Sequence, residues 1–287
     1  MKAQLLHLNS NLEYSFSARR DNTPQYHNRW HYHEELELIY FAKGSGTQFI
    51  GDSVRRFESG DITLVGSNLP HYWLFDEMYL QEDALEPADI RVLHFKENFW
   101  GNEFINLPEN KNIKDLMRLS KRGISLSEAS RSKSAELIDR ILNAANTLRI
   151  IHLLAILLCI SEEEQPDLLT SPTFSIQLQD PDANRMQIAM QYIGENYRDQ
   201  IRLEELASLT GMTPNSFCRY FKSQIGKTLF QFLIEMRVKT ACNLLLENKH
   251  TVKQICFEAG FQNFSSFHKY FKNLTGTTPL NFQRSKT

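Results

Sequence analysis

The sequence predicts a two-domain protein, with an all-β N-terminal part followed by helices and an all-α C-terminal part. Three observations lead to this prediction. A length of 287 residues corresponds to about two domains. Short β-rich segments separated by turn residues occupy roughly the first hundred positions, and a duplicated helical pattern occupies the last hundred. With 41% hydrophobic residues, 12 Gly, 9 Pro and 4 Cys, the composition excludes collagen-like, disordered and disulfide-rich classes.

Strands are indicated within residues 1–110. The β-rich segments are 35–42, 47–50, 53–57, 61–66 and 89–95. Gly-Ser-Gly, Gly-Asp and Ser-Gly turns separate several of them. Short strands with turn signals this frequent predict an all-β sandwich or barrel.

Helical periodicity replaces the strand pattern in residues 111–160. An i, i+3, i+4, i+7 stripe of apolar residues runs from Leu137 to Leu158, and its C-terminal half is apolar on nearly all sides. Two interpretations remain open: these helices pack on the β-rich part, or they form the seam of a dimer. Residues 161–183 contain SEEEQPD, SP and DP, which predict a linker before a helical part at 184–287.

Targeting and redox signals are absent from the sequence. The N-terminus has no apolar core of signal-peptide length, and the most apolar stretch, 148–160, is shorter than the roughly 20 residues of a membrane span. The four cysteines form neither a CxxC pair nor a zinc-finger spacing. We therefore expect a cytoplasmic protein with reduced thiols.

Charge is distributed unevenly along the chain. Residues 184–287 carry 14 Lys and Arg against 7 Asp and Glu, a net of +7, whereas residues 1–183 carry 18 against 27, a net of −9. A basic C-terminal part favours nucleic-acid binding, although segregation of this size also occurs in domains that bind nothing.

The C-terminal part contains an internal duplication with a period of about 50 residues. The copies span 201–232 and 251–282, and they share the pattern F-x-x-[YF]-F-K-x-x-x-G. Each copy is expected to form a helix, a tight turn at Gly211 or Gly260, and a second helix. Thr213 followed by Pro214 is typical of a helix N-terminus, and Asn263 is the corresponding capping candidate in the second copy.

Two helix-turn-helix units follow from this pattern, and the second helix of such a unit lies in the major groove of DNA. The aromatic residues of each second helix are expected in the core. The polar residues on its opposite face are the DNA-binding candidates: Asn215, Ser216, Cys218, Arg219 and Lys222 in the first copy, and Ser265, Ser266, His268, Lys269 and Lys272 in the second. Arg reads guanine and Asn reads adenine by paired hydrogen bonds, whereas Lys and Ser favour phosphates. Arg219 is the best single candidate for base recognition.

A strong helical pattern at 228–247 joins the two units. Its 20 residues would span roughly 30 Å at about 1.5 Å per residue. This length is close to the roughly 34 Å of one turn of B-DNA. A helix of this length could place both second helices in consecutive major grooves.

With these features, the C-terminal part resembles the AraC/XylS family of transcriptional regulators. The resemblance rests on LEELASLTGMTPNSFCRYFKSQIGKTLFQFLIEMRVKTACNLLLE and ICFEAGFQNFSSFHKYFKNLTGTTPLNFQ, about 100 residues in total. It departs at Cys256 and Phe257, where smaller residues are usual, and at Lys269, where the family often has Arg. The last departure weakens guanine reading by the second unit.

The resemblance implies a cupin-like jelly-roll sensor in the N-terminal part. His31, His33 and Glu37 reproduce the H-x-H-x3-E core of the cupin motif, and Pro70-His71 resembles part of the second motif. On one strand these first three residues would project to the same face. The candidate effector-binding residues are His31, His33, Glu37, His71, Tyr72 and Trp73, which suit a sugar or another small polar ligand.

A divalent metal is the less favoured occupant of the same place, with His31, His33, Glu37 and His71 as candidate ligands. We expect no cofactor and no catalytic residue. The expected protein is a homodimeric, effector-controlled regulator that binds double-stranded DNA and could contact RNA polymerase. Two other interpretations are a metal-dependent cupin enzyme with an appended DNA-binding domain, and a DNA binder that needs no ligand.

Overall fold

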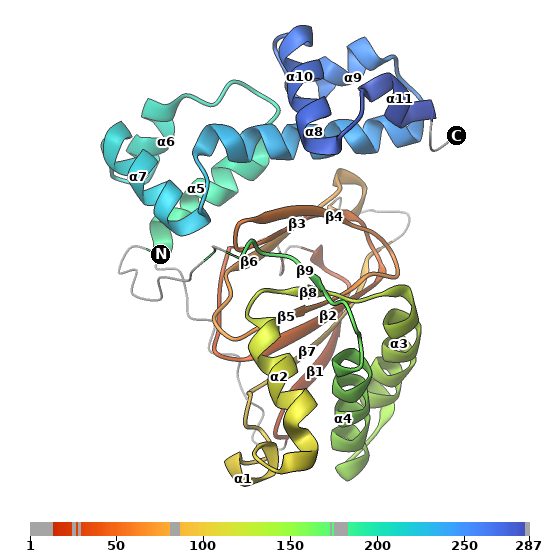
Figure 1. The fold of residues 1–287 in the computed structure, drawn as a ribbon. Coiled ribbons are helices and arrows are strands. Elements are labelled where there is room, and N and C mark those ends of the chain that lie inside the picture. Colours follow the sequence, from red (N-terminus) through yellow and green to blue (C-terminus); the bar gives the residue numbers. More distant parts are fainter. Residues whose placement is uncertain are drawn as a thin grey trace. The chain divides into compact units, whose positions relative to one another are not determined.

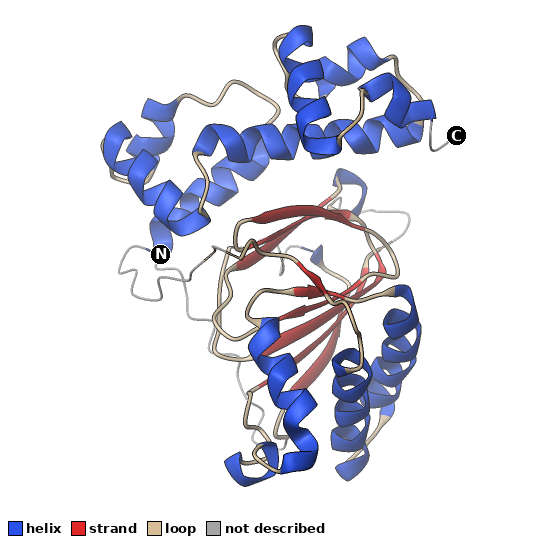
Figure 2. Cartoon of the chain, in the orientation of Figure 1, coloured by secondary structure: helices blue, strands red, loops and turns tan. Residues whose placement is uncertain are grey.

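The structure, a computed structural model, describes residues 14–24, 27, 30–80, 87–172, 174 and 183–284. The chain divides into two compact units, Met1–Pro181 and Asp182–Thr287 (Figure 1). We refer to them as the sensing unit and the helical unit. The described strands lie in the sensing unit, and the helical unit contains helices and loops (Figure 2). No helix within the described residues is long and apolar enough to cross a membrane.

Two antiparallel sheets form the sensing unit. The larger has the strand order β1-β7-β2-β5-β8-β9, and the smaller has the order β4-β3-β6. The strands are β1 (Ser17–Asp21), β2 (Leu36–Lys43), β3 (Gly46–Ile50), β4 (Ser53–Phe57), β5 (Ile62–Val65), β6 (His71–Phe75), β7 (Asp89–Phe95), β8 (Ile124–Ser125) and β9 (Asp167–Leu168). The five expected strands are present, and β1, β6, β8 and β9 are additional. An all-β fold with antiparallel sheets is thereby confirmed.

Alternating side chains divide the larger sheet into two faces. Ile39 and Phe41 of β2 point to the interior and pack with Phe57 and Trp73 of the smaller sheet. The intervening residues of β2, such as Leu38, join a second core on the outer face. Each face of the central strands is therefore buried, which explains why β2 and β5 are almost continuously apolar in sequence.

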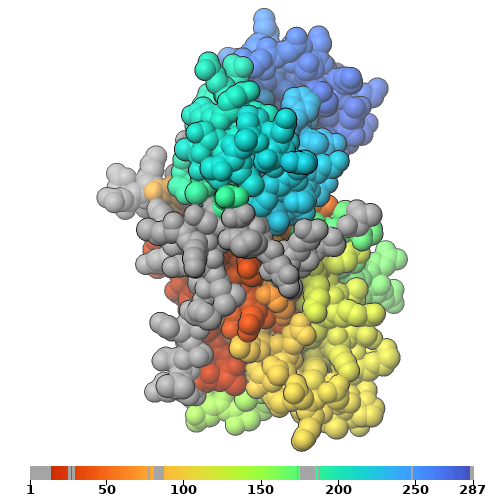
Figure 3. All heavy atoms as spheres, turned by 90° about the vertical axis from the view of Figure 1, so that its left-hand side faces the viewer, coloured from red at the N-terminus to blue at the C-terminus, as the bar shows by residue number. Residues whose placement is uncertain are grey.

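Helices cover the outer face of the larger sheet. They are α1 (Asn102–Ile105), α2 (Lys111–Ser120), α3 (Glu128–Asn143) and α4 (Thr147–Ser161), with short 3-10 turns at Glu77–Tyr79 and Pro108–Asn110. Their apolar residues and those of the outer face form one core, and in Figure 3 the yellow α1–α2 segment adjoins the red and orange strands. The region 111–160 thus packs on the sheet. However, α4 also keeps an exposed apolar stripe: Leu148 is 55% exposed, Ile151 51% and Leu158 47%.

The segment expected as a linker, 161–183, differs from that expectation in its first part. β9 pairs with β8, and Leu169 is buried in the interior core together with Phe41 and Trp73. Arg122 also donates a hydrogen bond of 2.5 Å to the carbonyl of Thr170. Backbone pairing and an apolar anchor therefore hold residues 167–170 in the sensing unit, which the polar composition of the segment did not reveal. Residues 173 and 175–182 lie outside the described residues.

The helical unit consists of seven described helices. They are α5 (Ala183–Asn196), α6 (Leu203–Leu209), α7 (Pro214–Ile225), α8 (Leu229–Glu247), α9 (Val252–Glu258), α10 (Phe264–Thr275) and α11 (Pro279–Arg284). Figure 1 shows α8 running between the group α5–α7 and the group α9–α11. Phe232 of α8 packs on Phe221 of α7, with ring centroids 5.5 Å apart, while Val238 and Ala241 lie in the core of the second group. Each helix-turn-helix unit is therefore built on its own end of one rigid helix.

A glycine pair in the two turns offers a matched test of this packing. Gly211 and Gly260 both have a left-handed backbone, with φ of 65° and 91°. A Cβ at Gly211 would meet no atom within 4 Å, whereas a Cβ at Gly260 would lie 2.6 Å from the carbonyl oxygen of Arg198. We expect Gly211→Ala to cost about 1–2 kcal/mol from the left-handed conformation alone. Gly260→Ala should cost about 2–4 kcal/mol because the clash is added. Denaturant unfolding followed by the helical circular dichroism signal measures both, and equal losses would contradict the close approach.

Candidate functional site

The second helix of the first helix-turn-helix unit, α7, begins as its sequence predicts. The Thr213 side chain accepts a hydrogen bond from the Ser216 backbone N–H, and Pro214 occupies the first turn. Phe217 and Phe221 are completely buried. Because the helix buries this stripe, the opposite face carries the candidates, and Asn215, Cys218, Arg219 and Lys222 are all exposed.

Two details of α7 differ from the expectation. Ser216 is only partly exposed, and its hydroxyl lies 3.0 Å from the Thr213 hydroxyl, so it belongs to the cap. Tyr220 is half-buried rather than buried. Within the described residues, no hydrogen bond or ion pair holds the guanidinium of Arg219. This side chain is therefore accessible to a ligand on the outer face of α7.

The second helix of the other helix-turn-helix unit, α10, repeats this construction. Asn263 caps it by accepting a hydrogen bond of 2.9 Å from the Ser266 backbone N–H, and Phe267 and Phe271 are completely buried. The exposed candidates are Ser265, Lys269 and Lys272, whereas Ser266 and His268 are partly buried.

His268 and Tyr270 deviate from the expected pattern of α10. The His268 ring packs against Phe264 with centroids 4.5 Å apart, so one side of the imidazole is covered. Tyr270 is half-buried, and its ring lies 6.0 Å from that of Phe230. The exposed candidates of α10 are therefore a serine and two lysines, without an arginine.

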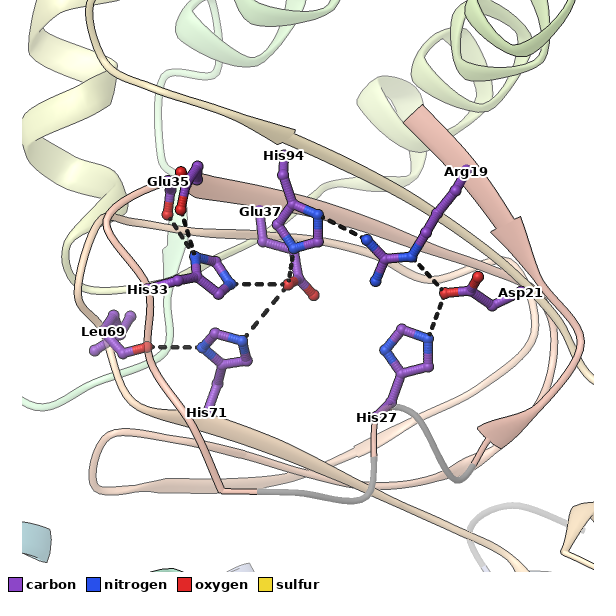
Figure 4. Close-up of polar contacts among 9 residues, drawn as sticks. All are labelled: Arg19, Asp21, His27, His33, Glu35, Glu37, Leu69, His71 and His94. Atoms are coloured by element: carbon purple, nitrogen blue, oxygen red, sulfur yellow. Dashed lines mark hydrogen bonds and ion pairs between the residues drawn. The ribbon is translucent and has the colours of Figure 1, made fainter. Parts of the chain in front are cut away.

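The sensing unit contains a second candidate site, a buried group of histidines around one carboxylate (Figure 4). We call His31, His33, Glu37, His71 and His94 the histidine cluster. His31 is 9% exposed and the other four at most 3%. One ligand atom from each of His31, His33, Glu37 and His71 lies within 4.8 Å of the others.

Four parts of the sensing unit supply the histidine cluster. His31 and His33 precede β2, Glu37 lies on β2, and His71 and His94 lie on β6 and β7. The expectation that residues 31, 33 and 37 share one strand is wrong, because the chain bends at residues 34–35 before β2 begins. His31 instead pairs with His71 through two backbone hydrogen bonds of 2.9 and 3.1 Å.

The remaining two effector candidates separate in space. Trp73 points to the interior like His71, with ring centroids 4.8 Å apart. Tyr72 lies on the other face of β6, where its ring is 5.2 Å from that of Phe49. Since neighbouring residues of a strand face opposite sides, Tyr72 does not join the histidine cluster.

His94 is a member of the cluster that the sequence analysis missed. It stands directly opposite Glu37 in the β2–β7 pairing, and its Nε2 is 2.6 Å from Glu37 Oε2. The strand pattern of segment 89–95 could have indicated this role. Ile90, Val92 and His94 share the interior face, and a buried polar side chain normally has a hydrogen-bond partner.

A second layer of polar residues orients the cluster. Arg19 donates a hydrogen bond of 3.0 Å to His94 Nδ1 and another of 2.8 Å to Asp21. His27 Nε2 lies 3.1 Å from the same Asp21 oxygen. Glu37 is thereby connected through His94 to an arginine and a second carboxylate.

Electrostatics keep Glu37 ionised in this buried place. Burial alone raises the pKa of its carboxyl, but His94, His33 and His71 outweigh burial and hold the pKa well below its usual range. Burial lowers the pKa of His94 to about 4, against the opposing effect of Glu37. His94 is therefore neutral near pH 7 and donates its Nε2–H to the Glu37 carboxylate.

Together, the fold and the two sites define a class of protein in which a β-rich sensor precedes a double helix-turn-helix unit. Residues 13–145 match the family model described as an AraC-like ligand binding domain, and residues 206–285 match the one described as a helix-turn-helix domain. The chain belongs to the AraC family of transcriptional regulators, as its sequence indicated.

Curated relatives match mainly in the helical unit. An uncharacterized HTH-type transcriptional regulator of Pseudoalteromonas carrageenovora is 34% identical over 100 residues, 35% of this chain and 59% of that protein. The bifunctional transcriptional activator/DNA repair enzyme AdaA of Bacillus subtilis is 30% identical over 36% of this chain and 49% of its own. The HTH-type transcriptional activator RhaR of Mannheimia succiniciproducens is 19% identical over 88% of this chain and 86% of its own.

The first two matches thus span about half the length of those relatives. Among solved structures, ToxT from Vibrio cholerae O395, bound to (E)-4-(8-methylnaphthalen-1-yl)but-3-enoic acid, covers 96% of this chain and 100% of its own. Its identity is 13% and its TM-score 0.37.

Proposed function

We propose that the protein is a sequence-specific regulator of transcription that binds double-stranded DNA through α7 and α10. The main support is the repeated construction of these helices, each with a buried aromatic stripe and an exposed polar face. The helix α8 between them has 19 residues, about 28 Å at 1.5 Å per residue. This length is compatible with two recognition helices in successive major grooves about 34 Å apart.

Arg219 is the proposed base-reading residue, and Lys222 and Lys272 are the proposed phosphate contacts. The bound sequence would first be obtained by selection from random duplexes with the full chain. We expect Arg219→Ala to lower discrimination at one base position by about 1–3 kcal/mol, because a bidentate contact to guanine is lost. Lys222→Ala and Lys272→Ala should weaken binding to all sequences and reduce its salt dependence. Binding isotherms on selected and scrambled duplexes measure both effects. Equal losses on the two duplexes for Arg219→Ala would refute its role.

A homodimer is the second part of the proposal. The exposed residues Leu148, Ile151 and Leu158 follow one another at helical spacing, and we call them the α4 stripe. Such a stripe suits self-association with a second copy, which would bring two helical units to one operator. Contact with RNA polymerase would then depend on the position of the operator relative to the promoter. Because its target is DNA, the protein is proposed to be cytoplasmic.

Control by a small polar effector is the third part. Effector binding in the sensing unit would shift a population between two arrangements of the DNA-binding parts, which requires a different affinity for each arrangement. The histidine cluster is the proposed effector site. A sugar-sized ligand would require the interior to open, because every cluster residue is nearly inaccessible.

The protein is proposed not to be an enzyme. A catalytic metal site keeps an open position that substrate can reach, whereas the histidine cluster is closed. A DNA binder without an effector is the remaining alternative. It predicts that no ligand of the sensing unit, Zn²⁺ included, changes operator affinity.

A further inference from the structure

Backbone carbonyls fix the protonation of two rings in the histidine cluster. His33 Nδ1 is 2.9 Å from the carbonyl oxygen of Glu35, and His71 Nδ1 is 2.7 Å from that of Leu69. A carbonyl oxygen only accepts hydrogen bonds, so each Nδ1 carries the proton and donates it. Each Nε2 is therefore the atom that meets Glu37, either with a proton that the carboxylate accepts in the metal-free protein or with a lone pair that a metal ion accepts.

Both Nε2 atoms face the same carboxylate. His33 Nε2 is 3.1 Å and His71 Nε2 is 3.6 Å from Glu37 Oε2. Within the described residues, His71 Nε2 and Glu37 Oε1 have no hydrogen-bond partner. A cation between these atoms would satisfy all of them.

We propose that the histidine cluster binds a divalent first-row transition-metal ion and that this ion is the effector. The ligands would be His31, His33, His71 and Glu37. The effector role of the ion rests on the proposed function, whereas metal binding itself does not. The ring orientations of this chain, and not the motif alone, support metal binding.

The geometry supports this ligand set. A tetrahedral ion with bonds of about 2.1 Å places its ligand atoms about 3.4 Å apart. The Glu37 separations of 3.1 and 3.6 Å to His33 and His71 lie on either side of that value. The shorter 2.6 Å contact of His94 is an ordinary hydrogen bond and marks it as an outer residue that orients Glu37.

The donor atoms restrict which metal ions fit the site. Three imidazoles and one carboxylate suit Zn²⁺, Co²⁺, Ni²⁺ and Fe²⁺ rather than Ca²⁺ or Mg²⁺, which prefer oxygen. Donation from Nδ1 to a backbone carbonyl is the outer-shell arrangement that metal-bound histidines usually have. An ion also fits the closed interior as it stands, whereas a sugar-sized effector would require the interior to open.

The first experiment measures binding without reference to DNA. The full chain, stripped with a chelator and freed of it, is dialysed against micromolar Zn²⁺ and analysed for metal content. We expect one ion per chain, an increased melting temperature, and replacement by Co²⁺ with a visible spectrum typical of low coordination. X-ray absorption should show nitrogen and oxygen ligands with imidazole scattering. No bound ion, or a sulfur ligand from one of the four cysteines, would overturn the site.

Variants then locate the ion. Glu37→Gln keeps the size of the side chain. Glu37→Gln and His71→Gln, each as a single variant, should lower Zn²⁺ affinity by more than about 100-fold. His94→Gln should lower it by about 10–100-fold, as expected of an outer residue. His250→Gln, outside the cluster and 38% exposed, is the matched control and should bind as the wild type does. Undiminished binding by a folded His33→Gln/His71→Gln double variant would refute the assignment. If that variant does not fold, the X-ray absorption spectrum of the wild type decides whether imidazole and carboxylate ligands bind the ion.

The last experiment tests whether the bound ion changes DNA binding, separately from whether it binds. Operator affinity of the full chain is measured with Zn²⁺ and with chelator, and should differ by about 5–150-fold, the usual range of allosteric coupling. Glu37→Gln should bind DNA with no response to Zn²⁺. An unchanged affinity with Zn²⁺ bound would overturn the effector role alone. Sequence-specific DNA binding without any metal binding would overturn the metal site and leave the proposed function intact.

Discussion

Replacing Phe267 by Ala is expected to lower the free energy of unfolding of the helical unit by about 3–5 kcal/mol. Phe267 is completely buried on the inner face of α10, and its ring lies 5.2 Å from that of Phe261 and 5.6 Å from that of Phe271. Truncation leaves a cavity at the centre of the second helix-turn-helix unit, where α10 is held against α9. Denaturant unfolding gives the loss. DNA binding by the second unit should fall with it, because α10 is no longer fixed.

Phe257→Ala is the matched control for this prediction. It removes the same atoms from the same unit, but Phe257 is 51% exposed on α9. A surface change of this kind is expected to stay within about 0.5 kcal/mol. Similar losses for the two variants would mean that α10 is not anchored as the structure indicates.

Introducing a charge into the α4 stripe should convert the proposed dimer into a monomer. Leu158→Glu places a carboxylate within the proposed apolar contact, and an unpaired buried charge is strongly unfavourable. Without the dimer, each operator is held by one helical unit instead of two. Linked binding raises affinity by about 10²–10⁴-fold, so a loss in this range is expected on a two-half-site operator. Analytical ultracentrifugation and operator binding measure the two consequences.

Leu107→Glu provides the control, because Leu107 and Leu158 are both 47% exposed and both lie in the sensing unit. Leu107 precedes the short turn Pro108–Asn110 and lies outside the α4 stripe. Its substitution should leave both the oligomeric state and operator affinity unchanged. A wild-type chain that sediments as a monomer at operator-binding concentrations would remove the α4 stripe from the proposal.

Local features were the most predictable part of this protein. The caps at Thr213 and Asn263 and the left-handed turns at Gly211 and Gly260 occur where the sequence indicates. Each depends on hydrogen bonds or dihedral angles within about four residues, which neighbouring side chains specify directly. The internal repeat strengthened them, since the same pattern appears twice.

The sensing unit was predictable in its strands but not in its contacts. Five strands were expected from alternating and β-branched residues, whereas β9 is two residues long inside a polar segment. Such a strand is held by its pairing with β8 and by burial of Leu169, and neither leaves a periodic pattern in the sequence. The same limit applies to α4, whose residues are apolar on nearly all sides.

The sequence by itself determined that this chain carries two helix-turn-helix units after a β-rich part, because helices, caps and repeats are written in residues close along the chain. Only the tertiary structure decided which face of α4 is covered and which is left as a stripe. It alone also brought His94 to Glu37, 57 residues earlier in the chain, and aimed two imidazole Nε2 atoms at that carboxylate. These arrangements depend on sheet register and on the closure of two sheets, which join residues that share no local pattern.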